Sequence, residues 1–294
     1  MKVVITIPAY NEEGTIGRVI SNIKEVMKKT KYSYRILVVD DGSKDKTAEI
    51  SKKSGAVVYK HPKNYGLAET FKTEMQKCLE LNADVIVHID ADGQYLAREI
   101  PLLIREIEKG NELVLGSRFK GKIESMPLIK RLGNIAFSKV ISQITKIKIT
   151  DAQTGFRAFT KEVAKKISII SNYTYTQEQI IRAARKKFKV KEVPVYFASR
   201  KSGKSRLISN PFRYAAKAWI NIFRIYRDYE PLKFFGAIGG FFFSIGALIG
   251  LWFVYLHFTS GIRGHPGLIT LMFLLLIMGI QIAIFGFLAD MSKK

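Results

Sequence analysis

Short apolar, β-branched runs alternate with segments of helical periodicity through residues 3–117. After the run 3–9, apolar side chains recur at the three- and four-residue spacing of one helix face: Ile16, Val19, Ile20, Ile23 and Met27. The other predicted strands are 34–40, 56–60, 83–90 and 112–117, and the other predicted helices lie near 45–54, 66–81 and 97–109. This alternation predicts an α/β fold with a mostly parallel, Rossmann-like sheet and helices on both faces. In such sheets, ligands bind beyond the carboxyl ends of the strands.

Two long apolar stretches lie near the end of the sequence. Residues 234–256 carry no charge, and in residues 268–288 Gln281 is the only strongly polar side chain. Because a transmembrane helix needs about 20 predominantly apolar residues, both stretches are long enough to span a bilayer. Trp252 and Tyr255 suit the aromatic belt at a membrane interface. A buried helical hairpin of a soluble protein is the alternative, and we favour the membrane protein.

Positive charge is concentrated on one side of these two spans. Residues 200–233 contain nine Lys or Arg against two acids, and two lysines follow the second span. The turn 257–267 between the spans carries Arg263 as its only full charge. Cytoplasmic segments carry the excess of Lys and Arg, so we expect the large domain and both termini in the cytoplasm.

The segment just before the first span reads as an amphipathic helix. Asn210 suits its cap and Pro211 its first turn. One face is aromatic and apolar, with Phe212, Ala216, Trp219, Phe223 and Tyr226. The other face is polar, with Arg213, Lys217, Asn221 and Arg224. That pattern is typical of a helix in a membrane interface, with a helix packed on the globular domain as the alternative. We expect a domain over 1–208, this interfacial helix over 209–230, and a hairpin over 231–294 with spans near 234–256 and 268–289.

Composition narrows the range of partners. The chain of 294 residues has a formal net charge of +23, which favours an anionic partner such as nucleic acid, a phosphate-bearing substrate or an anionic membrane. Nucleic-acid binding does not account for the two spans, so we discount it. Cys78 is the only cysteine, so no internal disulfide forms and nothing requires an oxidising compartment. A strand-like run begins directly after Met1-Lys2, so we expect no signal peptide.

An apolar strand leads directly into Asp90-Ala91-Asp92, with Gln94 two residues further on. Side chains at i and i+2 of a strand point the same way, so the two carboxylates are expected to lie close together. Two like charges at short distance are costly unless a cation neutralises them. Mg²⁺ and Mn²⁺ prefer carboxylate oxygens and often bridge to substrate phosphates, so Asp90, Asp92 and Gln94 are candidate metal ligands. The alternative is a plain Asp92-Gly93 turn, with Asp90 capping a helix.

Three further segments carry polar residues in positions that suit a ligand. In "IPAYNEEGTI" (7–16), capping of the next helix accounts for the asparagine and the glutamates but not for Pro8 and Tyr10. In "VVDDGSKDKT" (38–47), the acidic pair is either a polar turn or part of a site. The basic, glycine-containing "ASRKSGKSRL" (198–207) is either a solvated charge run or a site for an anionic headgroup.

Together these segments resemble the inverting family-2 glycosyltransferases of GT-A fold. More narrowly, they resemble the dolichol-phosphate mannose synthases and their bacterial polyprenyl-phosphate hexose relatives. The matching pieces, in the family's order, are "PAYNEE", "VVDDGS", "DADGQ", "GSR", "TDAQTGFRAF" (150–159) and R-x-x-G-x-S-R-L (200–207). The resemblance covers about residues 3–207. Tyr95 and the "NYGLAET" segment (64–70) depart from the family pattern, and they leave the donor sugar open.

The resemblance implies transfer of a hexose from a nucleoside-diphosphate sugar to dolichyl or polyprenyl phosphate. It implies a nucleotide-sugar site made of Pro8, Tyr10, Glu12, Val39, Asp41, Asp90, Ala91 and Asp92. Asp90, Asp92 and Gln94 would hold Mg²⁺ or Mn²⁺ on the donor diphosphate. The implied lipid-phosphate residues are Arg118, Arg131, Arg200 and Arg206, and the implied catalytic residues are Asp92, Arg118 and Arg200.

The expected chemistry depends mainly on charge. A divalent ion stabilises the nucleoside diphosphate as the sugar–oxygen bond breaks. The attacking lipid phosphate is already an anion at neutral pH and needs no general base, so arginines serve to bring two anionic substrates together. Glu178 lies near the position where hydroxyl-acceptor relatives carry a base, and we interpret it as an orienting or structural residue. Attack from the face opposite the leaving group inverts the anomeric centre.

Two other functions remain as alternatives. Transfer to a sugar hydroxyl needs a base and usually a longer membrane channel than two spans form. A non-catalytic scaffold that binds nucleotide sugars has no need to keep the carboxylates and arginines together. For the favoured function, mannose from GDP-mannose is the first expectation and glucose from UDP-glucose the second, with UDP-N-acetylhexosamine also open. Small residues in the first span offer a face for a homo-oligomer: Gly236, Gly239, Gly240, Ser244 and Ala247.

Overall fold

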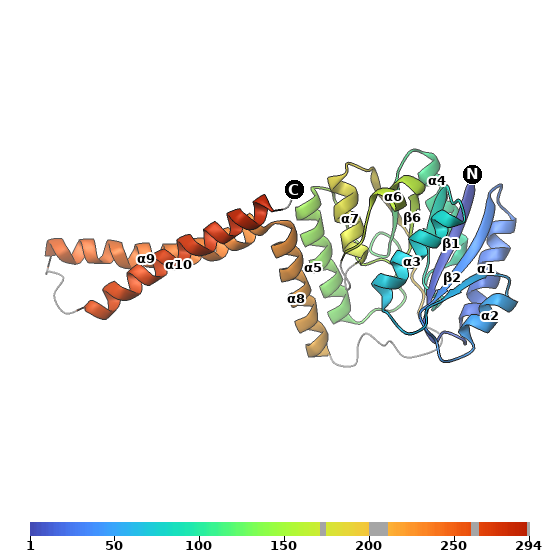
Figure 1. The fold of residues 1–294 in the computed structure, drawn as a ribbon, viewed down its shortest axis with the longest axis horizontal. Coiled ribbons are helices and arrows are strands. Elements are labelled where there is room, and N and C mark those ends of the chain that lie inside the picture. The colour runs from blue at the N-terminus through green and yellow to red at the C-terminus, as the bar shows by residue number, and fades with distance from the viewer. Residues whose placement is uncertain (171–174, 200–210, 260–264, 293–294) are drawn as a thin grey trace. The chain divides into compact units, whose positions relative to one another are not determined.

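The computed structural model describes residues 1–170, 175–199, 211–259 and 265–292. The chain divides into two compact units, Met1–Tyr214 and Ala215–Lys294. The first unit is an α/β domain and the second is helical (Figure 1). The domain boundary predicted at residue 208 lies outside the described residues.

Among the described residues, seven strands form one sheet in the order β3-β2-β1-β4-β6-β5-β7. The strands are β1 (Lys2–Ala9), β2 (Ser33–Asp40), β3 (Val57–Lys60), β4 (Val85–His88), β5 (Leu113–Ser117), β6 (Arg157–Thr160) and β7 (Val190–Pro194). The helices of this unit are α1 (Ile16–Lys28), α2 (Thr47–Lys53), α3 (Leu67–Glu80), η1 (Ala97–Glu99), α4 (Ile100–Glu108), α5 (Leu128–Thr145), α6 (Lys161–Lys166) and α7 (Tyr175–Arg185). Every strand and helix predicted before residue 118 is present, with ends within two residues of the prediction.

The sheet is mostly parallel, as predicted, but one strand is reversed. β1 pairs in parallel with β2 and β4, β2 with β3, and β5 with β7. β6 runs antiparallel to both of its neighbours, β4 and β5. Because of this reversal, the start of β6 lies beside the carboxyl end of β4, where Arg157 pairs with His88. The loop before β6 therefore reaches the edge at which parallel sheets bind ligands.

The two faces of the sheet bury different side chains. On one face, Ile5 and Val87 belong to an aliphatic core with the apolar positions of α1 and α4. On the other face, Phe71 of α3 lies near Phe159 of β6 and Tyr175 of α7, with ring centroids 6.1 Å and 4.4 Å away. Successive residues of a strand point to opposite faces, so helices cover both faces, as predicted (Figure 1).

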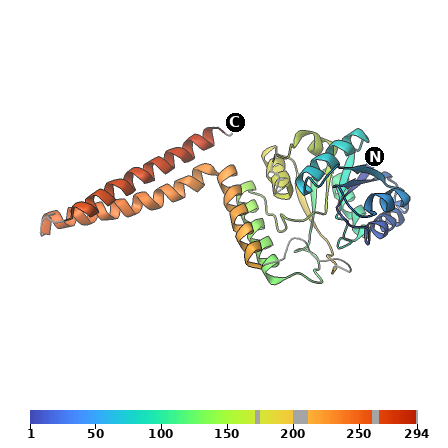
Figure 2. The ribbon, with the colours of Figure 1, turned by 60° about the horizontal axis from the view of Figure 1, so that its bottom comes forward.

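The second unit holds most of α8 (Pro211–Tyr229), with α9 (Pro231–Thr259) and α10 (Pro266–Met291). α9 and α10 lie side by side in both views (Figures 1 and 2). Both are long and apolar enough to cross a bilayer. Only 17% and 6% of their most apolar windows are buried, unlike the core helices of a soluble protein. The amphipathic α8 forms as predicted, and its place in a membrane interface stays a prediction.

Glycines bring α9 and α10 into close contact. A Cβ on Gly239 would lie 2.6 Å from the carbonyl oxygen of Gly279, and a Cβ on Gly279 would lie 2.7 Å from that of Gly239. Residues without a side chain permit this approach between two helices. Gly239, predicted for a face between chains, thus packs inside the hairpin, whereas a Cβ on Gly236 or Gly240 would meet no atom within 4 Å. A homo-oligomer stays a prediction.

Candidate active site

The turn after β4 carries both predicted carboxylate ligands. Gly93 adopts a left-handed φ of +73°, and the backbone N–H of Gln94 donates to Asp92 Oδ1 over 3.0 Å. The turn that was the alternative to a metal site therefore forms, and it carries both carboxylates. Burial and the charge of Asp92 raise the pKa of Asp90 to about 6. Two carboxylates that repel each other in this way form a site that a cation stabilises.

Gly155, from the loop before β6, forms one wall of this turn. A Cβ on Gly155 would lie 2.7 Å and 2.8 Å from the two carboxylate oxygens of Asp90, so the carboxylate rests against bare backbone. The N–H of Gly155 donates to the Tyr95 hydroxyl over 3.3 Å, and that hydroxyl also lies 3.2 Å from Thr154 Oγ1. Tyr95, a departure from the family pattern, therefore fixes the position of the loop beside Asp90.

The chemistry of the turn fits Mg²⁺ or Mn²⁺. Within the described part of the chain, no group of three or more His, Cys, Asp and Glu side chains is arranged to hold a metal. Two carboxylates leave most positions of an octahedral ion to water and substrate oxygens. That arrangement is usual for Mg²⁺ at phosphate-binding sites, and Mn²⁺ prefers the same oxygen ligands.

Gln94 links the turn to a segment about 100 residues further along the chain. Its Nε2 donates to the carbonyl of Ala198 over 3.0 Å, and the N–H of Ala198 donates to the carbonyl of Gln94 over 2.9 Å. An amide nitrogen only donates and an amide oxygen only accepts, so Oε1 is the atom suited to a metal. Gln94 thus holds the segment at 198, and its predicted role as a metal ligand stays a prediction.

The residues predicted for the nucleotide follow two neighbouring strands. Pro8 of β1 pairs with Val39 of β2 in the sheet. The N–H of Glu12 donates to Thr47 Oγ1 over 2.8 Å, so a hydrogen bond joins the segments that follow the two strands. Val39 is fully buried, and its predicted contact with the nucleotide stays a prediction. The predicted nucleotide residues at this shared edge are Pro8, Tyr10, Glu12, Val39 and Asp41.

Asp41 is already bound within the protein. Its carboxylate accepts from the N–H groups of Tyr65 and Gly66, over 2.9 Å and 2.8 Å, and lies 2.8 Å from Nδ1 of His61. The residue is only 4% exposed. Sequence reasoning missed this role, which holds the loop before α3 in place. The predicted contact with the nucleotide stays a prediction.

Arg118 is buried in an ion pair with Asp151. Its Nε donates to Oδ2 over 2.7 Å, and its Nη2 donates to Oδ1 over 2.8 Å. Glu192 accepts from the N–H of Asp151 over 3.0 Å and lies 3.0 Å from Lys120 Nζ. Two nitrogens of Arg118 are therefore committed to the protein, and its predicted contact with a lipid phosphate stays a prediction.

The structure places two of the four predicted lipid-phosphate residues. Arg118 directly follows β5, and Arg131 is exposed on α5. Arg200 and Arg206 lie outside the described residues. The three predicted metal ligands, Asp90, Asp92 and Gln94, all lie in the turn after β4, and their role stays a prediction.

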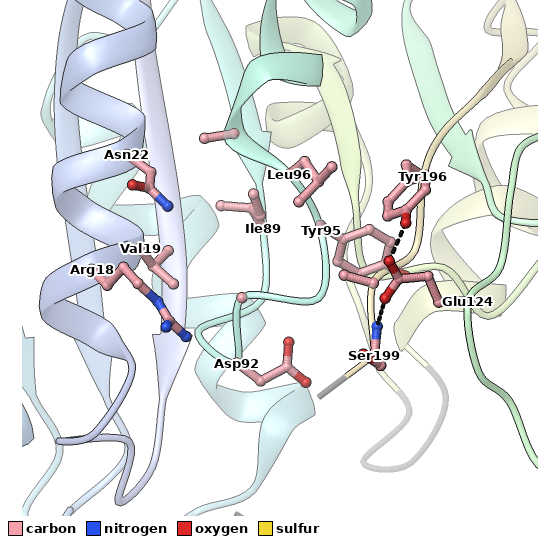
Figure 3. A pocket seen from close by; sticks show the side chains of 13 residues that line it. Arg18, Val19, Asn22, Ile89, Asp92, Tyr95, Leu96, Glu124, Tyr196 and Ser199 are labelled. Carbon is pink, nitrogen blue, oxygen red and sulfur yellow. Dashed lines mark hydrogen bonds between the residues drawn. The ribbon is translucent and has the colours of Figure 1, made fainter. Parts of the chain in front are cut away.

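A pocket of about 280 Å³ opens beside Asp92. α1, the turn after β4 and residues 196–199 contribute to its lining (Figure 3). Arg18 of α1 extends toward the turn, and Glu124 accepts from the N–H of Ser199 over 2.6 Å. Sequence reasoning missed Arg18 and Glu124, because an arginine on an amphipathic helix and a glutamate in a loop look like ordinary solvated charges.

Glu178 lies on α7 and is paired with Arg182. Its Oε1 accepts from Arg182 Nε over 2.7 Å and from the N–H of Ile170 over 3.0 Å, and the side chain is buried. These contacts are those of a carboxylate that fixes the start of α7 and the segment before it.

Comparison with known proteins identifies relatives of the chain. The family profile described as "Glycosyl transferase family 2" matches residues 4–168. The chain is 34% identical over 215 residues to the UDP-N-acetylglucosamine–dolichyl-phosphate N-acetylglucosaminyltransferase of Methanococcus voltae, covering 65% of this chain and 83% of that one. It is 32% identical over 209 residues to the dolichyl-phosphate hexose transferase of Haloferax volcanii, covering 71% and 86%.

Solved structures show the same fold. Glucosyl-3-phosphoglycerate synthase from Mycobacterium tuberculosis, in complex with Mn²⁺, UDP-glucose and phosphoglyceric acid, matches with a TM-score of 0.59. The match covers 75% of this chain and 79% of that one at 18% identity, which bears on the fold alone. The predicted GT-A-like α/β fold is thereby confirmed.

Proposed function

The chain belongs to glycosyl transferase family 2 and is a glycosyltransferase, and from this premise we propose that it transfers a hexose from a nucleoside-diphosphate sugar to a polyprenyl or dolichyl phosphate. The reaction depends on a divalent metal and inverts the anomeric centre. The observation that carries the proposal is the pair Asp90 and Asp92 at the carboxyl end of a central strand. Two relatives are named for dolichyl phosphate, which supports the choice of acceptor.

Mg²⁺ or Mn²⁺ would be held by Asp90, Asp92 and Gln94 Oε1, together with oxygens of the donor diphosphate. The ion supplies Lewis-acid stabilisation of the leaving nucleoside diphosphate. The raised pKa of Asp90 supports this assignment, because burial and the charge of Asp92 leave an electrostatic cost that a cation removes. A solved structure of the same fold binds Mn²⁺ with UDP-glucose, which adds support.

The acceptor is a phosphate anion and attacks without a general base. The chain's own task is then to bind two anions close together and to orient them. Glu178 fits this view, because it is buried and paired with Arg182 instead of being free to take a proton from a hydroxyl. Arg118 and Arg131, with Arg200 and Arg206 outside the described residues, are the proposed phosphate ligands.

The acceptor also explains the helical hairpin. A polyprenyl chain resides in a bilayer, and α9 and α10 are long and apolar enough to cross one. We place the catalytic domain and both termini in the cytoplasm, because Lys and Arg are concentrated before the first span and after the second. α8 would lie in the membrane interface.

The experiment that tests the proposal offers labelled GDP-mannose, UDP-glucose and UDP-N-acetylglucosamine, one at a time, to the full chain in detergent with a short polyprenyl phosphate. Mn²⁺ or Mg²⁺ is present, and EDTA is the control. We expect lipid-linked label from one donor, lost with EDTA. Mannose is the first expectation and glucose the second, while the named Methanococcus relative also keeps N-acetylglucosamine open. Nucleotide binding without lipid-linked product from any donor would instead indicate a hydroxyl acceptor.

A further inference from the structure

A chain of buried polar side chains crosses the sheet face that α3 covers. Thr6 Oγ1 donates to Glu74 Oε1 over 2.9 Å, and Glu74 Oε2 lies 3.2 Å from Nε2 of His88. Nδ1 of His88 in turn lies 2.7 Å from the carbonyl oxygen of Gly155. All three side chains are fully buried. Because a carbonyl oxygen only accepts, Nδ1 of His88 carries a proton and donates to Gly155.

The imidazole of His88 is held rigidly between aromatic rings. Phe71 lies on α3 with its ring centroid 5.4 Å from the imidazole, and Tyr175 lies on α7 at 5.8 Å. Glu74 Oε2 lies at ion-pair distance, 3.2 Å, from the far nitrogen, Nε2. The donor at Nδ1 therefore has one direction available, toward Gly155.

Gly155 is also the residue against which Asp90 rests. Both carboxylate oxygens of Asp90 lie within 2.8 Å of the place where a Cβ of Gly155 would be. The backbone of Gly155 is held at two points: its carbonyl accepts from His88, and its N–H donates to Tyr95. Its position, and with it the space left to the Asp90 carboxylate, is set from both sides.

A buried glutamate–histidine pair carries a desolvation cost that apolar side chains in a core do not carry. Desolvating two ionisable groups costs several kcal/mol, and well-packed apolar residues of similar volume are often equally or more stabilising. Buried polar networks that are kept in spite of this cost can define one conformation. Here the conformation that they define is that of the Gly155 peptide.

We propose that His88, held by Glu74, is a positioning residue for Asp90: its hydrogen bond to Gly155 fixes the backbone wall that orients the Asp90 carboxylate toward a divalent cation. The inference rests on the proposed function, because it takes Asp90 as a metal ligand. In this role His88 acts on Asp90 through the backbone of Gly155, and both variants described next remove its charge, so that charge does not distinguish them.

Two matched double variants isolate this one hydrogen bond. His88→Asn with Glu74→Gln puts an amide nitrogen at the position of Nδ1, so the donor to Gly155 is kept. His88→Gln with Glu74→Gln extends the amide to the position of Nε2, so the donor to Gly155 is lost. Both remove the ionisable pair.

The readout is Mn²⁺ affinity, measured by electron paramagnetic resonance on the full chain in detergent with saturating UDP, and separately with GDP. We expect the Gln form to bind Mn²⁺ about tenfold more weakly than the wild type, as is usual when support behind a metal ligand is lost. The Asn form should stay within about threefold of the wild type. In turnover assays with the donor that the wild type uses, the Gln form should lose kcat more than it raises KM for the lipid. Thermal unfolding identifies any variant that does not fold.

Equal Mn²⁺ affinity in both double variants, whether unchanged or weakened, would overturn the inference, because the bond to Gly155 would then not matter. Tyr95→Phe is the second test, since it removes the hydroxyl at the other end of the Gly155 peptide and keeps the ring. It should weaken Mn²⁺ binding without lowering the unfolding temperature by more than a few degrees, and unchanged affinity there also counts against the inference. If the wild type bound no Mn²⁺ with either nucleotide, Asp90 would not be a metal ligand, and the proposed function would fail together with this inference.

Discussion

Two acidic clusters at the carboxyl edge of the sheet are built in opposite ways. Beside the end of β5, Asp151 forms an ion pair with the guanidinium of Arg118, and Glu192 forms one with Lys120. After β4, Asp90 lies beside Asp92, and burial and that second charge raise the pKa of Asp90 to about 6. The first cluster holds the structure together. In the proposed function the second is stabilised when a cation binds, which is how a site reserved for a ligand differs from a structural ion pair.

The largest expected effect comes from Asp92→Ala in the Asp90–Asp92 pair. Removing a metal ligand should lower turnover about a thousandfold, equivalent to about 4 kcal/mol in the barrier. The unfolding temperature should stay close to that of the wild type. Asp84→Ala, at the opposite end of β4, is the matched control and should leave turnover unchanged. Near-normal turnover in Asp92→Ala would remove the metal proposal.

Arg118→Met breaks the neutralised cluster. It leaves the Asp151 carboxylate buried without its partner, so the free energy of unfolding should fall by about 3–5 kcal/mol. Adding Asp151→Leu should recover most of that loss, as followed by far-UV circular dichroism in denaturant. A double variant that is stable but inactive would support the predicted contact between Arg118 and a lipid phosphate. A single variant as stable as the wild type would contradict the structural role.

Asp90→Asn tests whether the Asp90–Asp92 pair costs stability. A carboxyl whose folded pKa lies above its unfolded pKa binds more protons when folded, so the metal-free wild type gains stability as pH falls from 7 toward 4. Asparagine avoids this cost and should make the metal-free protein about 1–2 kcal/mol more stable at pH 7.5. That advantage should shrink as pH falls and vanish below about pH 4. A variant less stable than the wild type at pH 7.5 would show that the pair is not repulsive.

The smallest effect is expected from Glu178→Gln, since Glu178 belongs with the neutralised carboxylates. The amide keeps its shape and an oxygen for the N–H of Ile170, so turnover with a polyprenyl phosphate should fall less than about threefold, and stability by about 1 kcal/mol. Loss of a general base would instead lower the rate by about 10²–10⁴. A loss of that size would favour a hydroxyl acceptor.

Much of this comparison could be anticipated from the sequence, but not all of it. Local patterns predicted the strands before residue 118 and the two apolar helices, and they offered the turn at Asp92-Gly93 as the alternative to a metal site. The reversal of β6 was not predicted, because pairing direction depends on contacts across the sheet. The pairing of Arg118 with Asp151, 33 positions later, was missed for the same reason. The buried partners of Asp41 were missed as well, because a polar strand end looks the same in sequence whether it meets solvent or the protein.

The reversed strand also bears on how the protein is made. A chain leaving the ribosome presents β4 and the Asp90 turn long before β6 and Gly155. Until β6 arrives, β4 is the open border of a partial sheet, with unpaired backbone groups that invite pairing with another chain. A nascent or truncated product that stops before Gly155 would therefore carry Asp90 and Asp92 but lack the backbone against which Asp90 packs. Such a product would be prone to aggregate.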